Sequence, residues 1–319
     1  MKEIGGYFEL ELSDKGEYHK DALNLNSGRS CFLYIIKAQQ PKKVYFPYYI
    51  CNSILEPLVS EGVPFEFYNI DNNFEIIGDI EVKEGEKILY VNYFGLKSNY
   101  VKGLAKKYSK RFIVDNTQNF YEMPIENIDT FYSPRKFFGV SDGGYLYTNK
   151  RMNEQFEYDE SAEFATQLLG RIDKNAGDYY ELYHKAENRL INQPIKLMSK
   201  ITRAILKSID YEEVKCKRNY NFEYLHSKLQ EENFLKFDPS YLDTAMIYPF
   251  VSINNKLKSH FISENIYVAS YWGEVKDRKG CCDMEKQLVD QLVPLPIDQR
   301  YDESDMDRIL FVLAEGKDE

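Results

Sequence analysis

Three short segments of the sequence combine residue types that could hold an anionic ligand and react with it. The first, Asn26-Ser27-Gly28-Arg29-Ser30, opens a predicted helix. A helix N-terminus presents unpaired N–H groups and the positive end of the helix dipole to an anion, and Gly28 would let the backbone approach that anion closely. Arg29 could add a charged donor and Ser30 a hydroxyl. The same residues could instead form an ordinary helix start that Ser27 caps.

The second segment follows the apolar run FIV and reads Asp115-Asn116-Thr117-Gln118. In open α/β sheets, ligands bind beyond the carboxyl ends of the strands. A carboxylate at this point therefore faces a ligand or caps its own turn. Both interpretations stay open from these residues alone.

The third segment surrounds Lys136, which lies among aromatic residues between a predicted strand and the pair Gly143-Gly144. Burial lowers the pKa of a lysine and makes its amine a usable nucleophile toward a carbonyl group. The alternative is a lysine whose stem lies on aromatic surface while its charged head stays in water.

The order of the three segments along the chain matches the parts that pyridoxal 5′-phosphate (PLP) needs. The helix start would take its phosphate, Asp115 its pyridine nitrogen, and Lys136 its aldehyde. The negative charge of Asp115 would keep the ring nitrogen protonated, so that the ring can accept electrons from a substrate. The sequence therefore predicts a PLP enzyme in which Lys136 holds the cofactor.

The composition argues against several other classes of protein. In 319 residues, 51 acids outnumber 41 bases, whereas a nucleic-acid binder needs clustered Lys and Arg. The five cysteines form no CxxC pair, and with four histidines they predict neither a disulfide framework nor a metal site. No apolar run approaches the ~20 residues of a membrane span. We expect a cytoplasmic protein with reduced cysteines and with no nucleic-acid or membrane partner.

Apolar runs alternate with longer amphipathic stretches from residue 24 onward, which predicts a mostly parallel sheet with helices on both faces. The predicted helices of this part span 28–39, 52–60 and 99–109. The predicted strands span 43–46, 64–68, 87–92, 111–115, 129–131 and 144–148.

The pattern changes after residue 151. Residues 153–213 are predicted to be mostly helical, and a shorter mixed pattern follows. That pattern consists of a helix at 223–231, strands at 244–253 and 266–269, and a last helix at 303–313. We therefore expect a large domain of residues 1–213, which includes the helical stretch, and a small C-terminal α+β domain of residues 214–319.

The three segments resemble those of the DegT-type sugar aminotransferases, within fold type I of the PLP-dependent enzymes. The resemblance runs in patches from about Leu23 to the C-terminus. The helix start resembles the family's Ser-Gly-Thr phosphate turn, with Arg29 in place of Thr. Asp115 and Gln118 match its Asp-x-x-Gln. Lys136 followed by Asp142-Gly143-Gly144 matches its lysine segment, and this match is the most specific one.

The resemblance implies a fold and a role for each matched residue. The fold would be the three-layer, mostly parallel sheet of the aspartate aminotransferase kind, in a homodimer. The cofactor-binding residues would be Gly28, Arg29 and Ser30 at the phosphate, Asp115 at the pyridine nitrogen and Gln118 near the ring hydroxyl. Tyr49 or its neighbour Tyr48, after a predicted strand, would cover one face of the ring.

The chain departs from the family's pattern at two places. Five residues before the lysine, Phe131 stands where the family has a phosphate-binding Ser, and Ser133 could substitute for it. The family's Asn-Tyr-Arg-Met-Ser segment, whose Asn reaches the neighbouring subunit's cofactor, keeps only Met198-Ser199. Its first three places are taken by Ile195, Lys196 and Leu197.

We therefore expect transfer of an amino group from a donor such as glutamate to a keto sugar, free or nucleotide-linked. A sugar dehydratase is a related alternative, but the dehydratases of this family resemble variants with His in place of the lysine. A second alternative is a non-catalytic relative that keeps the fold and binds a sugar or a protein partner. The two departures favour this reading, and the joint presence of Asp115, Gln118 and Lys136 opposes it.

Overall fold

A seven-stranded sheet forms the centre of the computed structural model, which describes residues 4–237, 239 and 243–317. Its strands are β1 (Leu23–Leu25), β2 (Lys43–Pro47), β3 (Phe65–Tyr68), β4 (Glu86–Val91), β5 (Phe112–Asp115), β6 (Asp129–Tyr132) and β7 (Gly144–Tyr147). They are ordered β1-β7-β6-β5-β4-β2-β3. The pairings from β3 through β6 are all parallel, and β7 runs antiparallel to both β6 and β1. The predicted mostly parallel α/β sheet is confirmed.

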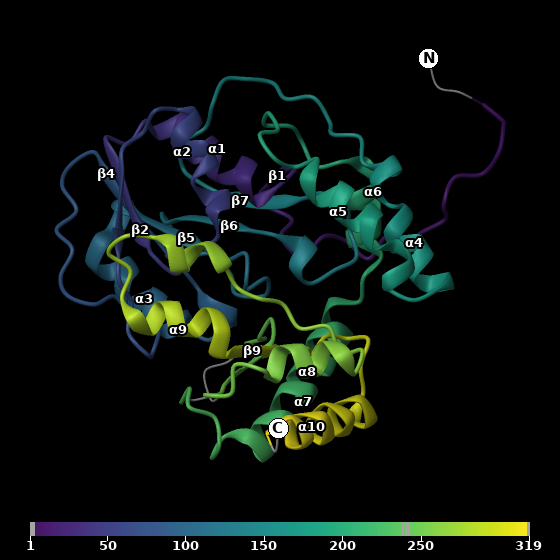
Figure 1. Cartoon of the computed structure of the whole chain (residues 1–319). Coiled ribbons are helices and arrows are strands. Elements are labelled where there is room, and N and C mark those ends of the chain that lie inside the picture. Colours follow the sequence, from purple (N-terminus) through teal and green to yellow (C-terminus); the bar gives the residue numbers. More distant parts are fainter. Residues whose placement is uncertain (1–3, 238, 240–242, 318–319) are drawn as a thin grey trace.

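Helices cover both faces of this sheet (Figure 1). Those of the first half are α1 (Gly28–Gln39), α2 (Glu56–Ser60) and α3 (Ser98–Tyr108). α1 has the predicted bounds, because Ser27 caps its first turn. The helix predicted at 52–60 is divided into a 3₁₀ turn, Asn52–Ile54, and α2. Pro57 explains the division, because a proline has no N–H to continue the preceding turn into a helix, whereas the first turn of α2 tolerates it.

The region predicted to be mostly helical contains α4 (Thr166–Asp173), α5 (Tyr180–Asn188), α6 (Lys200–Ser208) and the start of α7 (Tyr211–Leu229). The prediction is wrong for two extended stretches on either side of α4 and α5. In these stretches Leu197 forms bridges to Leu25 and Tyr158, so their backbones pair beside β1. The helix predicted at 223–231 is the end of the longer α7. Because α7 crosses residue 213, the proposed domain boundary at that point stays a prediction.

The C-terminal part contains β8 (Tyr248–Val251) paired antiparallel with β9 (Leu292–Leu295), and the helices α8 (Leu257–Ser263), α9 (Asp283–Gln291) and α10 (Glu303–Lys317). Many of its buried apolar residues form a second cluster, whereas Val251 of β8, Leu292 of β9 and Leu288 of α9 belong to the cluster around the large sheet. The strand predicted at 266–269 is wrong. Ile266 and Val268 are buried in that second cluster, but the Ile266 N–H bonds to the Phe261 carbonyl and closes a turn after α8. In the described part of the chain, no helix is long and apolar enough to cross a membrane.

A close backbone contact holds the start of α1 against β7. The Gly143 N–H donates to the Asn26 carbonyl at 2.7 Å, and Gly143 has a φ of +120°. At Gly144, a Cβ atom would lie 2.4 Å from the Ser27 carbonyl oxygen. Gly143 adopts a backbone conformation that residues with side chains rarely adopt, and Gly144 leaves no space for a Cβ atom. The close contact therefore requires glycine at both positions.

We expect Gly144→Ala to destabilise the protein by about 1–3 kcal/mol, because the new methyl group meets backbone that cannot rotate away. Gly103→Ala is the matched control. Gly103 lies inside α3 with open space at the position of a Cβ, so alanine should raise stability there by about 0.5–1 kcal/mol. Urea unfolding followed by circular dichroism measures both. Equal changes in the two variants would contradict the close contact.

Candidate active site

The carboxyl ends of the parallel strands place the predicted site residues along one edge of the sheet. Asp115 ends β5, and Ser133 and Lys136 follow β6. Gly28, at the start of α1, faces the same loops: a Cβ atom on it would lie 3.3 Å from Thr117 Cγ2 and 3.9 Å from Ser133 Cβ. The fold thus brings together segments that are more than one hundred residues apart in the sequence.

Thr117 links the aspartate to the lysine. Asp115 Oδ1 accepts a hydrogen bond from the Thr117 N–H at 2.9 Å. The Thr117 hydroxyl oxygen accepts one from Lys136 Nζ, also at 2.9 Å. Sequence analysis missed Thr117, which occupies an unspecified place within Asp-x-x-Gln. Its position two residues after Asp115 is the one signal that could have drawn attention to it.

The protein shifts the pKa values of Asp115 and Lys136 in opposite directions. Desolvation by burial raises the pKa of the Asp115 carboxyl, and the nearby Lys136 opposes that rise. Desolvation lowers the pKa of the Lys136 amine, and Asp115 opposes that fall. Lys136 nevertheless remains exposed to solvent as a residue. The amine is therefore desolvated while part of the residue stays accessible to solvent, and desolvation favours the neutral, nucleophilic form of an amine.

Gln118 is the next member of the loop after β5, and it is fully buried. Its Oε1 accepts a hydrogen bond from the Phe94 N–H at 2.8 Å. Its Nε2 is buried without a hydrogen-bond partner among the described residues. A buried donor left unpaired costs free energy, and each one therefore requires an explanation.

The start of α1 has the geometry of an anion site. The Ser27 hydroxyl accepts from the Ser30 N–H at 3.0 Å, and the two hydroxyl oxygens also lie 3.0 Å apart. The remaining N–H groups of a first helical turn have no partner within the helix. Ser133, the suggested substitute for the family's serine, lies beside this turn because its Cβ is close to Gly28.

Two predicted cofactor contacts lie in other surroundings. The Arg29 guanidinium forms an ion pair with Glu56 of α2, with its Nε 3.8 Å from the carboxylate. The buried Tyr49 donates its hydroxyl to the Tyr271 carbonyl at 3.3 Å and packs edge-on against Trp272. The structure thus places Tyr49 in an aromatic wall against the C-terminal part of the chain. The roles predicted for Arg29 and Tyr49 stay predictions.

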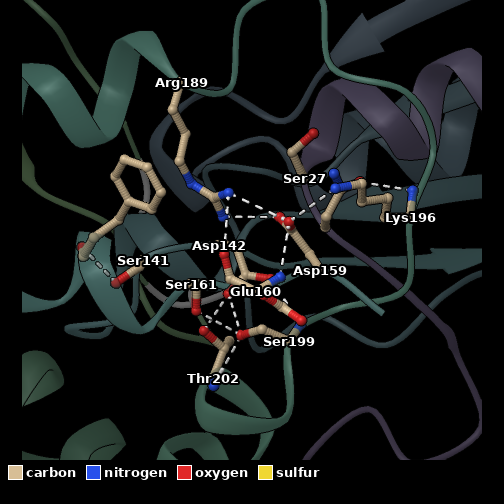
Figure 2. A network of polar contacts seen from close by, with 12 residues as sticks. Ser27, Ser141, Asp142, Asp159, Glu160, Ser161, Arg189, Lys196, Ser199 and Thr202 are labelled. Carbon is tan, nitrogen blue, oxygen red and sulfur yellow. Dashed lines mark hydrogen bonds and ion pairs between the residues drawn. The ribbon is translucent and has the colours of Figure 1, made fainter. Parts of the chain in front are cut away.

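Asp142, six residues after the lysine, acts as a buried anchor for α6. Its carboxylate accepts hydrogen bonds from the N–H and hydroxyl of Ser199, at 2.8 and 2.7 Å, and from the Thr202 hydroxyl. Figure 2 shows these groups converging on Asp142, next to the ion pairs of Asp159 with Arg189 and Lys196. The surviving Met198-Ser199 of the family's segment therefore belongs to the start of α6, where Ser199 caps the helix.

A second anchor holds the residue immediately after Lys136. The carbonyl of Phe137 accepts hydrogen bonds from Gln299 Nε2 at 2.9 Å and from Arg218 Nη2 at 3.4 Å. Arg218 also donates to Gln299 Oε1 and to the Met246 carbonyl, and its guanidinium lies over the Phe137 ring. Sequence analysis missed both residues, because their partners are more than 80 positions away. Among the described residues, no group of acids, Cys and His is arranged to hold a metal ion.

Comparison with known proteins agrees with this geometry at the level of the fold. No protein-family model and no curated protein matches the sequence. Solved structures do match: a DegT/DnrJ/EryC1/StrS aminotransferase from Brucella abortus has a TM-score of 0.63 at 16% identity, over 92% of this chain and 85% of that chain. NtdA from Bacillus subtilis, with bound cofactor PMP, has a TM-score of 0.65 at 14% identity, over 96% and 78%. This chain has the fold of these enzymes.

A GDP-4-keto-6-deoxymannose-3-dehydratase with bound GDP-perosamine has the same fold, with a TM-score of 0.63 at 17% identity over 94% of this chain and 93% of that chain. The predicted fold type I architecture is thereby confirmed. Because an aminotransferase and a dehydratase both adopt it, the reaction has to be argued from the site residues of this chain.

We expect Arg218→Met to lower the free energy of unfolding by about 2–4 kcal/mol, because it leaves buried carbonyl groups without their donor. Because Met keeps much of the apolar volume of the arginine side chain, the loss of unfolding free energy measures mainly the lost hydrogen bonds. Arg171→Met, at an exposed position of α4, is the control and should change stability by no more than about 0.5 kcal/mol. Thermal and urea unfolding measure both variants. Similar losses in the two would show that Arg218 does not anchor Phe137.

Proposed function

We propose that this chain is a PLP-dependent aminotransferase that transfers an amino group from an amino acid such as glutamate to a keto sugar, free or nucleotide-linked. The observation that carries the proposal is the hydrogen bond from Lys136 to Thr117. Thr117 also bonds to the buried Asp115 and contacts Gly28 at the start of α1. An amine, a carboxylate and an anion-binding helix start, the three groups that PLP needs, therefore surround a single residue.

Two further features of the site fit PLP. The unpaired Nε2 of Gln118 is a donor that the ring hydroxyl oxygen of the cofactor would satisfy. Asp115 is a buried carboxylate with a raised pKa, and a protonated ring nitrogen is the positive partner that would favour its charged form. We therefore assign Asp115 and Gln118 to the cofactor ring.

Gly28, Ser30 and Ser133 would hold the phosphate. A phosphate group at the start of α1 would accept hydrogen bonds from first-turn N–H groups. Ser133 lies beside Gly28 and offers a hydroxyl from the loop after β6. Arg29 would contribute to this site if its side chain left Glu56, with which it is paired in this structure.

PLP, when bound, supplies an aldehyde that combines with amines and a ring that accepts electrons from the substrate. The chain's own residues then have separate tasks. Lys136 would hold the cofactor and, once freed by the donor, carry a proton to and from the substrate carbon. Its lowered pKa leaves more of the amine in the neutral form that can act as a base. Thr117 would orient that amine, and Asp115 would keep the proton on the ring nitrogen.

A non-catalytic relative that binds a sugar or a protein is the second candidate. The Arg29–Glu56 ion pair favours this second candidate, because the Arg29 guanidinium is paired with Glu56 and a phosphate would have to compete for it. The replacement of the family's phosphate-binding serine by Phe131 points the same way. A dehydratase is the third, and the resemblance of Lys136 to the aminotransferase lysine argues against it.

The proposal includes two further elements. We propose that the enzyme acts as a homodimer, as its DegT-type resemblance implies. We also propose a cytoplasmic location, which the five free cysteines support, because such thiols persist in a reducing compartment.

We expect the purified protein to turn yellow when PLP is added. Borohydride should then fix PLP to the protein as a covalent adduct. Peptide mass spectrometry should then find the adduct on Lys136. Lys136→Ala should abolish both effects, whereas Lys200→Ala, which changes an exposed lysine of α6, should leave them intact. If the wild-type protein stays colourless and forms no adduct, the proposal of a PLP enzyme is wrong and the non-catalytic binding relative is supported. Loss of the yellow colour on adding glutamate would then support amino-group transfer over other PLP reactions.

We expect the electrostatic coupling of Asp115 and Lys136 to be measurable in the cofactor-free protein. Asp115 stabilises the charged amine and so raises its pKa; Asp115→Asn removes that effect and should lower the pKa of Lys136 further. The pH at which Lys136 is half-labelled by an amine-directed reagent should therefore fall, as read by mass spectrometry. Asp115→Glu keeps the charge and serves as the control. A midpoint that stays or rises in Asp115→Asn would show that the two groups are not coupled.

A further inference from the structure

Arg135, the residue immediately before Lys136, places a positive charge beside the candidate nucleophile. It belongs to the 3₁₀ turn Pro134–Lys136 that follows β6, and its side chain is 19% exposed. Desolvation by burial is the largest cause of the lowered pKa of the Lys136 amine. Among the neighbouring charges, Arg135 lowers this pKa further and Glu187 of α5 raises it. Both groups therefore lie close enough to the amine to act on its charge.

The Arg135 guanidinium makes few hydrogen bonds for a cation that is largely removed from water. Its Nη2 donates to the Glu187 carboxylate in an ion pair. Its Nε is buried without a partner, and the guanidinium makes no other hydrogen bond within the described part of the chain. A guanidinium has five N–H donors in one plane. Most of the donors of Arg135 are therefore unused, although one carboxylate already balances its charge.

Two tyrosines border this ion pair. Tyr183 precedes Glu187 by one turn of α5, and although 47% of the residue is exposed, burial of its hydroxyl raises its pKa. Glu187 adds to that rise and Arg135 opposes it. Burial also raises the pKa of Tyr271, and Tyr183 adds to the rise. The Tyr271 carbonyl accepts the hydroxyl of Tyr49 at 3.3 Å. The ion pair thus has aromatic neighbours, among which charges interact more strongly than in water.

An amino-acid donor brings a second carboxylate to this place. The donor carries its carboxylate on the same carbon as the amine that displaces Lys136 from the cofactor. The carboxylate therefore comes within a few ångströms of the position that the Lys136 amine has left. A carboxylate without a partner costs free energy where water is scarce, so the site has to supply a cation. Arginine suits this task, because its planar fork can form two parallel hydrogen bonds to a carboxylate.

We propose that Arg135 binds the carboxylate of the amino donor and that Glu187 occupies Arg135 until the donor arrives. The inference rests on the proposed aminotransfer and makes Arg135 a specificity-determining residue for it. The donor carboxylate accepts from the unused N–H groups and competes with Glu187 for the shared one. Glu187 thereby lowers the affinity for every carboxylate donor, and an amine without a carboxylate gains nothing from Arg135.

Two substitutions that break the same ion pair should change the reaction in opposite directions. Arg135→Gln should raise the KM for L-glutamate roughly 10–100-fold with little change in kcat, because a charge-assisted contact to the donor is lost. Glu187→Gln should lower this KM by about 3–10-fold, because the donor carboxylate no longer has a competitor. If the ion pair only ties the lysine loop to α5, both variants should be impaired alike, and the proposal is overturned.

An amine without a carboxylate separates recognition of the donor from damage to the site. With ethylamine, the absorbance of bound PLP should change at similar rates in the wild type and in Arg135→Gln. Arg171→Gln on α4 and Glu181→Gln on α5, both at exposed positions, should leave the KM for L-glutamate unchanged. If Arg135→Gln slows the reactions of glutamate and ethylamine equally, Arg135 acts on the lysine or on the fold, and the proposal is overturned.

A test in the cofactor-free protein keeps this inference separate from the proposed function. Glutarate has two carboxylates and no amine. Bound at Arg135, it should slow the labelling of Lys136 by an amine-directed reagent, because its negative charge favours the charged form of the amine. Peptide mass spectrometry measures the ratio of labelling rates with and without glutarate in each variant. The ratio should approach one in Arg135→Gln and lie further from one in Glu187→Gln.

The result with glutarate decides the carboxylate site whatever happens with PLP. If glutarate fails to protect Lys136 in the wild type, or protects it equally in Arg135→Gln, the proposal is overturned. If glutarate protects Lys136 as expected and the protein never turns yellow with PLP, the aminotransferase proposal alone fails, and Arg135 is still the residue that binds a carboxylate.

Discussion

The candidate site depends on one contact between two stretches of backbone. At Gly144, β7 approaches the Ser27 carbonyl so closely that a single Cβ atom would lie 2.4 Å from the oxygen. Backbone cannot change rotamer to relieve such a contact, so the start of α1 has one position relative to β6 and β7. That position brings Gly28 against Thr117 and Ser133. The N-terminal end of the helix and the loops that follow β5 and β6 therefore meet because Gly28 and Gly144 lack side chains.

The loop that carries Lys136 is held on both sides by buried polar groups from distant helices. On one side, Phe137 is bound through its carbonyl by Arg218 of α7 and by Gln299. On the other side, Asp142 binds the first turn of α6. Both anchors are buried, so breaking either leaves polar groups without partners in a medium of low dielectric constant. The position of the lysine is thereby coupled to the packing of the C-terminal part of the chain, although the Lys136 amine itself bonds to Thr117.

The errors of the sequence analysis have a common origin. Residues 153–213 were predicted to be mostly helical, yet Leu197 pairs with Leu25 of β1 and with Tyr158, because the edge of the sheet offers it backbone partners that no local pattern reveals. The strand predicted at 266–269 is absent because its apolar residues are buried by the turn after α8. In each case a long-range partner outweighed a local preference.

Local signals in the sequence determined much of this protein on their own. The start of α1 at Gly28, the alternation of apolar runs with amphipathic helices, and the order of helix start, Asp115 and Lys136 all follow from residues close together in the chain. Their physical basis is short-range, because capping, periodicity and the ends of parallel strands act within a few residues. Only the tertiary structure decided that Thr117 joins Asp115 to Lys136, that Gln118 keeps an unpaired donor, and that Asp142 anchors α6. These features depend on groups that lie 19, 24 and 57 residues apart in the chain, and they exist only after burial has removed water and left each polar group to the partner that the fold provides.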